Sequence, residues 1–266
     1  METIIGMGLA LVMGIVLGLI GGGGSILTMP ILVYLLGFTP VDATAHSLFI
    51  VGMTSLAGSL TYLRRKLISL KTAIVFAVPS FLAVFLTRKY LMPAIPEKLF
   101  EIGGFMITKD LFIMCLFALL MLACAFSMIY KPFVKSDKKV GLRFNYPLIL
   151  FEGFVVGVLT GILGAGGGFL IVPALVLLVN LPMKLAVGTS LLIISTKSLI
   201  GFLGDLGGPI QINWHLAILF SIFAIIGILI GSYFCKYVPE QKLKSAFGWF
   251  VLVVGIFIFI KELIIS

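Results

Sequence analysis

Charged residues are scarce in this chain. Only 11% of its 266 residues are Asp, Glu, Lys or Arg, whereas 61% are hydrophobic. A soluble domain has about a quarter charged residues and about half apolar residues. This deficit excludes a soluble enzyme or a soluble binding module. It predicts an all-α polytopic membrane protein, because helices satisfy their own backbone hydrogen bonds in lipid.

Cysteine and histidine are also rare, with three and two residues. Cys115, Cys124 and Cys235 all lie in apolar runs, their number is odd and no CxxC motif occurs. The pattern predicts buried thiols, with neither a disulfide framework nor a metal site. The chain has no nucleophile elbow and no P-loop, and its loops are too short for an ATP-binding domain. We therefore expect no enzymatic activity, no cofactor and no transport driven by ATP.

Acidic residues are outnumbered by basic ones, 10 to 19, which gives a formal charge of +9. Most of the basic residues lie in short loops between apolar runs, such as Arg64-Arg65-Lys66. Basic loops orient a protein in the membrane and contact lipid headgroups. They predict membrane lipid as the partner of these charges, and no nucleic acid. The expected location is the cell (inner, cytoplasmic) membrane, with several crossings and no cleaved signal peptide.

Long apolar runs account for most of the chain. They cover 4–36, 43–63, 70–90 and 110–130, then 147–179, 185–204, 213–235 and 243–263, with a Lys-rich connector at 131–146. Crossing a bilayer takes roughly 20 residues, so the first and fifth runs are too long for one straight helix. Each of these two is expected to be a steeply bent helix, or a helix, a turn and a shorter returning helix.

Glycine clusters interrupt both of the long runs, as Gly21-Gly22-Gly23-Gly24-Ser25 and as Gly164-Ala165-Gly166-Gly167-Gly168. Each glycine costs a helix roughly 1 kcal/mol relative to Ala. In lipid, the freed backbone groups cost several kcal/mol each unless a partner satisfies them. Two such breaks, at corresponding positions of two halves, point to the binding site of a transporter. The alternative interpretation is that small residues allow close helix packing.

The two halves are related by a shift of 143 positions without a gap. The shift places Gly18 on Gly161, Pro30 on Pro173 and Ser47 on Ser190. Glycines, prolines and serines in one register predict an internal duplication. The predicted units are an N-terminal repeat at 1–130, the connector at 131–146 and a C-terminal repeat at 147–266, within one integral membrane domain.

The number of crossings decides how the repeats are oriented. About eight to ten transmembrane helices fit the runs. Five crossings per half place most Lys and Arg on one side of the membrane, whereas four per half give no clear bias. Five is odd, so the repeats would be inverted and both termini would lie outside the cytoplasm. A re-entrant hairpin at 25–36 stays an alternative.

Polar residues follow both breaks and could line a path for an anion. A helix that begins at a break points backbone N–H groups into it, and Ser25 and Thr28 add hydroxyl donors. Ser47 and Ser55 are eight residues apart, as are Ser190 and Ser198, so each pair lies near one helix face. Hydrogen bonding between helices is the alternative role. The candidate substrate-binding residues are Gly21, Gly22, Gly23, Gly24, Ser25, Thr28, His46, Ser47, Gly164, Gly166, Gly167, Gly168, Thr189, Ser190 and Lys197.

Lys197 is the most unusual of these residues, because it lies inside an apolar run. A lysine at the centre of a membrane helix costs at least about 2.5–3.5 kcal/mol, so it indicates a functional site. It is predicted to attract an anion and to pair with Asp205; snorkelling to the interface is the alternative. Histidine side chains exchange protons near neutral pH, so His46 is a candidate for proton coupling, or else an ordinary polar residue at the interface.

The paired motif G-x-x-G-x-G-G-G/S-x-L-x-x-P resembles that of the sulfite exporter TauE/SafE family. Asp42-Ala43-Thr44-Ala45-His46-Ser47 and Ala186-Val187-Gly188-Thr189-Ser190 fit the same pattern. The resemblance covers essentially the whole chain. The resemblance implies export or uptake of small anions, often sulfur oxyanions such as sulfite or organosulfonates such as sulfoacetate, and in some members other sulfur compounds. Two departures are Ala165, where the first half has Gly22, and His46, where the second half has Thr189.

We therefore expect a secondary transporter or facilitator for a small, sulfite-like anion, working by alternating access at the paired broken helices. An anion channel is the alternative. An intramembrane enzyme or scaffold is disfavoured, because His46 and Ser47 are neighbours and do not face each other on a helix. A homodimer is left open.

Overall fold

A computed structural model of the chain describes residues 2–102, 105–130, 146–164, 167–177, 179–205 and 212–265. Of the candidate site residues, Gly166 lies outside the described residues, and so do the connector 131–145 and Ala165. Gly23 and Ser25 are placed as part of a helix.

The first half forms six α-helices, two π-helical segments and a hairpin. Their bounds are α1 Glu2–Ile20, α2 Gly23–Pro30, η1 Ile31–Leu35, α3 Pro40–Arg64, α4 Leu70–Leu86, η2 Thr87–Leu91, α5 Met92–Ala94, β1 Lys98–Ile102, β2 Phe105–Thr108 and α6 Lys109–Tyr130. The second half is described as α7 Tyr146–Leu163, α8 Gly168–Leu177, α9 Met183–Asp205, α10 Trp214–Cys235 and α11 Glu240–Ile265. The short antiparallel hairpin of β1 and β2 lies where no strand was predicted.

The expected fold class is confirmed: the chain is a helical, polytopic membrane protein. Six of the described helices are long and apolar enough to cross a membrane. Shorter apolar helices occupy the two runs that carry glycine clusters, at Ile5–Ile20 and Ile26–Leu35 and at Ile149–Leu163 and Gly168–Leu177. Each of these runs therefore contains two short helices joined by a turn, and not the single bent helix that was the other expected form.

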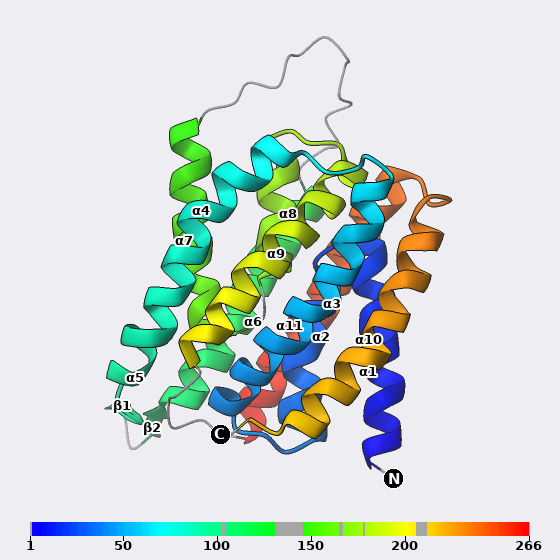
Figure 1. Cartoon of the computed structure of the whole chain (residues 1–266). Coiled ribbons are helices and arrows are strands. Elements are labelled where there is room, and N and C mark those ends of the chain that lie inside the picture. Colours follow the sequence, from blue (N-terminus) through cyan, green and yellow to red (C-terminus); the bar gives the residue numbers. More distant parts are fainter. Residues whose placement is uncertain are drawn as a thin grey trace.

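Helix α2 returns along α1. Gly24 in α2 lies against Leu17 and Met13 of α1, and the Thr28 hydroxyl contacts the Met13 sulfur at 2.9 Å. Together α2 and η1 rise about 20 Å, at 1.5 Å per residue, which is short for a full crossing. In Figure 1, α1 begins and α11 ends at the lower end of the bundle, whereas α7 begins at its upper end. Hence α1 and α7 run in opposite directions.

The helix packing is the same when the halves are exchanged. Helix α1 packs on α10 and α7 on α4, while α3 and α9 pack on each other, as do α6 and α11. Helix α3 also contacts α10, and α9 contacts α4. Figure 1 shows α4, α9, α3 and α10 side by side across the front, with α6, α11, α2 and α8 behind them. Inverted repeats would give this arrangement, and the duplication itself stays a prediction from the sequence.

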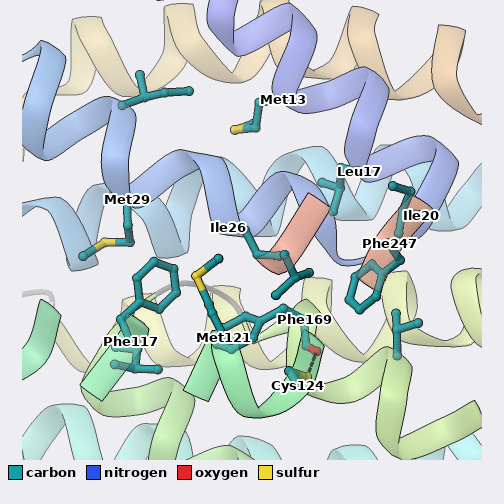
Figure 2. Close-up of a cluster of buried hydrophobic side chains, with 14 of the residues drawn as sticks. Met13, Leu17, Ile20, Ile26, Met29, Phe117, Met121, Cys124, Phe169 and Phe247 are labelled. Carbon is teal, nitrogen blue, oxygen red and sulfur yellow. Dashed lines mark hydrogen bonds between the residues drawn. The ribbon is translucent and has the colours of Figure 1, made fainter. Parts of the chain in front are cut away.

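Buried side chains join the short helices to α6 (Figure 2). The Phe117 and Phe169 rings pack edge to face with centroids 5.4 Å apart. The Cys124 thiol donates to the Phe169 carbonyl at 2.8 Å. That carbonyl has no partner four residues on, because Pro173 has no N–H. The free, buried Cys124 thus replaces a hydrogen bond that the helix lacks.

Apolar side chains also cover the outer surface of the bundle, as a membrane protein requires. On α4 the exposed residues recur every four positions, at Leu70, Ile74, Val78, Leu82 and Leu86. This spacing places them on one face of the helix. Such a stripe fits the expectation from the sequence that membrane lipid surrounds the bundle.

Helices α1 and α10 approach so closely that their backbones touch, which leads to a first prediction. A methyl group on Gly227 would lie 2.9 Å from the Ile15 nitrogen, whereas one on Gly8 would meet nothing within 4 Å. We expect Gly227→Ala to cost about 1–3 kcal/mol, because overpacking forces the helices apart. Gly8→Ala should be neutral or stabilising by at most about 1 kcal/mol. Thermal unfolding in detergent compares the two, and equal shifts would contradict this packing.

Candidate functional site

Both glycine clusters begin with a glycine in the left-handed backbone conformation. Gly21 has φ +76° and Gly164 has φ +64°. Their N–H groups bond the carbonyls of Leu17 and Thr160 at 2.8 and 2.9 Å, which closes the last turns of α1 and α7. This is the usual αL ending of a helix, and a residue with a side chain would be strained there. The glycines thus turn the chain from one short helix into the next.

The two breaks meet in the interior of the bundle. A methyl group placed on Gly168 would lie 2.7 Å from the Gly22 Cα atom, so the two backbones are in direct contact. Both glycines are needed for this approach, because any side chain would push the breaks apart. The structure therefore brings together Gly22, from the first cluster, and Gly168, from the second.

Each break also packs against a long helix of the other half. Gly21 lies against Val187, one turn into α9, and Gly164 lies against Thr44, one turn into α3. The Ser190 hydroxyl is within 2.9 Å of the Gly21 carbonyl and 2.8 Å of the Val187 carbonyl, and donates to one of them at a time. Ser190 therefore contacts the first break through a backbone carbonyl, and its predicted role in binding substrate stays a prediction.

Lys197 lies at the second break. Its side chain is 1% exposed, and a methyl group on Gly167 would lie 2.6 Å from its Nζ atom. Its single hydrogen bond to a described residue goes to the Thr160 hydroxyl, at 3.1 Å. A protonated amine carries three N–H donors, so two have no acceptor among the residues that the structure describes. Because Gly167 has φ +64° and no side chain, the amine reaches the break itself.

The pairing predicted between Lys197 and Asp205 is wrong. Asp205 instead binds Arg88, which donates from Nε at 2.8 and 3.0 Å and from Nη2 at 2.6 Å. Both side chains are buried, at 2% exposed for Arg88 and 7% for Asp205. A planar guanidinium matches a carboxylate in this bidentate way, whereas an ammonium does not. The carboxylate is therefore already neutralised, and Lys197 has no anionic partner among the described residues.

Arg88 is the residue that the sequence analysis did not select. It lies in the π-helical segment η2. Such segments are rare in proteins, and those that occur are often found at functional sites. Its Nη1 donates to the Thr44 hydroxyl at 2.8 Å and to the Gly161 carbonyl at 3.4 Å. Thr44 is the residue that packs on Gly164, so Arg88 supports the second break. An arginine near the end of the apolar run 70–90 was the signal for it.

Three buried serines on the two long helices have hydroxyls without a hydrogen-bond partner among the described residues: Ser47, Ser55 and Ser198. An unpaired buried hydroxyl is costly, so such groups usually serve a ligand or water. Ser55 and Ser198 correspond under the 143-residue shift. These hydroxyls fit the predicted polar path along α3 and α9.

His46 and Thr189 form hydrogen bonds with the segments that precede α10 and α4. The His46 Nε2 atom accepts from the Asn213 N–H at 3.0 Å, and its Nδ1 lies 2.8 Å from the Asp42 carbonyl. Nε2 accepts, so Nδ1 donates and the ring is neutral. In the same way Thr189 accepts from the Ser69 N–H at 3.0 Å, just before α4. His46 and Thr189, at equivalent positions, thus secure the starts of α10 and α4.

The remaining candidates are local to α2. Thr28 donates from its hydroxyl to the Gly24 carbonyl at 3.0 Å or to the Met13 sulfur, so it serves the helix pair α1 and α2. Gly24 allows that pair to pack closely, as described above. At the first break the described residues thus contribute the Ser190 hydroxyl, apolar side chains and backbone groups, and the described cationic groups are at the second break. No cluster of metal ligands occurs among the described residues.

The sequence of the chain is similar to a known family of membrane proteins. A family model described as "Sulfite exporter TauE/SafE" matches residues 6–258. A "Probable membrane transporter protein" of Xylella fastidiosa (strain Temecula1 / ATCC 700964) is 29% identical, over 92% of this chain and 90% of that protein. The "Probable membrane transporter protein YunE" of Bacillus subtilis (strain 168) is 31% identical, over 79% of this chain and 80% of its own length. No solved structure gives a significant match.

Proposed function

Because this chain belongs to the sulfite exporter TauE/SafE family, we propose that it is a secondary transporter or facilitator for a small anion. The substrate class is a sulfur oxyanion or an organosulfonate, and the membrane is the cytoplasmic membrane of the cell. The membrane-transporter names of its relatives support a transporter rather than an enzyme.

One observation carries the proposal: a buried lysine amine, with N–H donors that no described residue accepts, lies at a break between helices. Lys197 is 1% exposed and bonds Thr160, and Asp205 is held by Arg88. An isolated buried cation costs several kcal/mol, so it is retained where a ligand of opposite charge compensates it. The N-terminus of the ten-residue α8 begins at Gly168, and its positive end favours an anion at the same place.

Alternating access would use the contact between the two halves. Gly22 and Gly168 touch through their backbones, with no side chain between them. A contact of this kind lets one half rock against the other while the anion site stays with the second half. The serine hydroxyls of α3 and α9 would then receive the anion on its way to and from the break.

Flux through proteoliposomes tests the proposal. Purified protein is reconstituted, and uptake of ³⁵S-labelled sulfite is measured by counterflow for the wild type and for Lys197→Gln. We expect the variant to lose about tenfold or more of its flux, because a lost buried charge contact is worth at least 1.4 kcal/mol. Lys89→Gln removes an exposed cation as a control and should leave the flux unchanged.

Folded protein is verified for both variants by gel filtration and thermal unfolding. Wild-type flux in a folded Lys197→Gln variant would contradict the proposal. Saturable counterflow identifies a transporter, whereas single-channel conductance in planar bilayers would identify the channel alternative.

A further inference from the structure

The buried charges of the membrane helices nearly cancel at the second break. Arg88 and Asp205 form one bidentate ion pair, and Lys197 is left as the uncompensated cation beside it. Lys244 is also buried, but it lies in the first turns of α11, near the loop that follows Cys235. His46 is neutral, because its Nε2 accepts a hydrogen bond. When Lys197 is protonated, the described groups at the break thus sum to a single positive charge.

We propose that the site takes a monoanion and rejects a dianion. This inference rests on the proposed function and specifies the charge of its substrate. A monoanion bound to the Lys197 ammonium makes a neutral pair that can move through the low-dielectric interior. A dianion leaves one negative charge without a partner, and an unpaired buried charge is strongly disfavoured.

The first break cannot provide the missing charge. Under the 143-residue shift, Lys197 corresponds to Thr54 and Thr160 corresponds to Leu17. The Thr54 hydroxyl donates to the Ile50 carbonyl at 2.6 Å, and Leu17 is fully buried in the apolar core. In place of the Lys197 amine the first half has the Thr54 hydroxyl, which binds its own helix. In place of the Thr160 hydroxyl it has the hydrocarbon side chain of Leu17.

Arg88 is close enough to supply a second charge if its partner is removed. Arg88 contacts the Gly161 carbonyl, and Lys197 contacts the hydroxyl of the neighbouring Thr160. Both cations therefore reach the last turn of α7, immediately before the second break. Asp205 holds the Arg88 charge in balance, so the preference for a monoanion depends on this carboxylate.

Anions of matched shape and different charge separate the possibilities. Perchlorate and sulfate are tetrahedral and similar in size, with one and two negative charges, and methanesulfonate is a monoanionic sulfur compound. Proteoliposome uptake of ³⁵S-labelled methanesulfonate is measured with perchlorate or sulfate as competitor, and uptake of ³⁵S-labelled sulfate is measured directly. We expect both monoanions to be accepted and sulfate to be weaker by about a hundredfold, since an unpaired charge costs several kcal/mol.

Two variants add a positive charge near the site and should therefore improve the uptake of a dianion. Asp205→Asn keeps the shape of the side chain and frees the Arg88 charge, and Thr54→Lys adds a cation at the equivalent position of the first half. Whichever of them folds should accept sulfate about tenfold or more better than the wild type. If one does not fold, the other still decides.

Sulfate that competes as well as perchlorate in the wild type, or a folded charge variant that gains no sulfate uptake, would overturn the inference and leave the proposed transport function standing. No flux of any anion would instead refute the proposed function, and this inference with it.

Discussion

An Arg88→Met variant should lose about 3–5 kcal/mol of stability, because it leaves the Asp205 carboxylate buried without its partner. Arg88 donates three hydrogen bonds to Asp205 and two more to Thr44 and the Gly161 carbonyl. Few single substitutions cost as much. Thermal and denaturant unfolding in detergent measure the loss.

A double variant separates the ion pair from the desolvation cost. Replacing a buried pair by apolar residues of similar size is often neutral. Arg88→Met with Asp205→Leu should therefore recover most of the stability that Arg88→Met loses. If the double variant were as unstable as the sum of both single variants, the pair would not be coupled, and the assignment would be wrong.

The other half of the chain offers a neutral solution to the same packing problem. Under the 143-residue shift, Asp205 corresponds to Tyr62 and Arg88 to Gly231. The Tyr62 hydroxyl donates to the Gly18 carbonyl at 2.6 Å, just as Arg88 approaches the equivalent Gly161 carbonyl. One half thus uses a phenol where the other half uses an ion pair. A phenol is therefore sufficient to bind the carbonyl at this position, which indicates that the ion pair of Arg88 and Asp205 has a role beyond binding the Gly161 carbonyl.

The helices and the breaks were predictable because their signals are local. Hydrophobic runs of about 20 residues and clusters of glycine depend on neighbouring residues alone, and the described helices follow the predicted runs closely. The glycine clusters end helices wherever the chain is placed, so Gly21 and Gly164 were found as turning points.

The partners of the buried charges were not predictable, because they come from distant parts of the chain. Arg88 and Asp205 are 117 residues apart, and helix α4 must pack on α9 before they meet. Spacing on one helix suggested Lys197 and Asp205 as a pair, but the π-helical turn at η2 brings Arg88 to the carboxylate instead. The roles of His46 and Thr189 were hidden for the same reason, since Asn213 and Ser69 lie on other segments.

Gly167→Ala is expected to lose as much flux as Lys197→Gln. Gly167 has φ +64°, and a methyl group there would collide with the Thr160 methyl and lie 2.6 Å from the Lys197 Nζ atom. The left-handed conformation alone costs a residue with a side chain roughly 1–2 kcal/mol. The collision would also displace the amine from the break, so sulfite flux should fall by about tenfold or more.

Two companion variants separate strain from collision. Gly37→Ala has the same backbone problem at φ +69° but meets nothing within 4 Å, so it should lose stability and keep its flux. Thr160→Ser removes the colliding methyl and keeps the hydroxyl that binds Lys197, so adding it to Gly167→Ala should restore part of the flux. If Gly37→Ala lost as much flux as Gly167→Ala, backbone strain rather than access to the ammonium would explain the effect. Restoration by Thr160→Ser would show that the collision with the Thr160 methyl, and not the left-handed backbone conformation alone, causes the loss of flux.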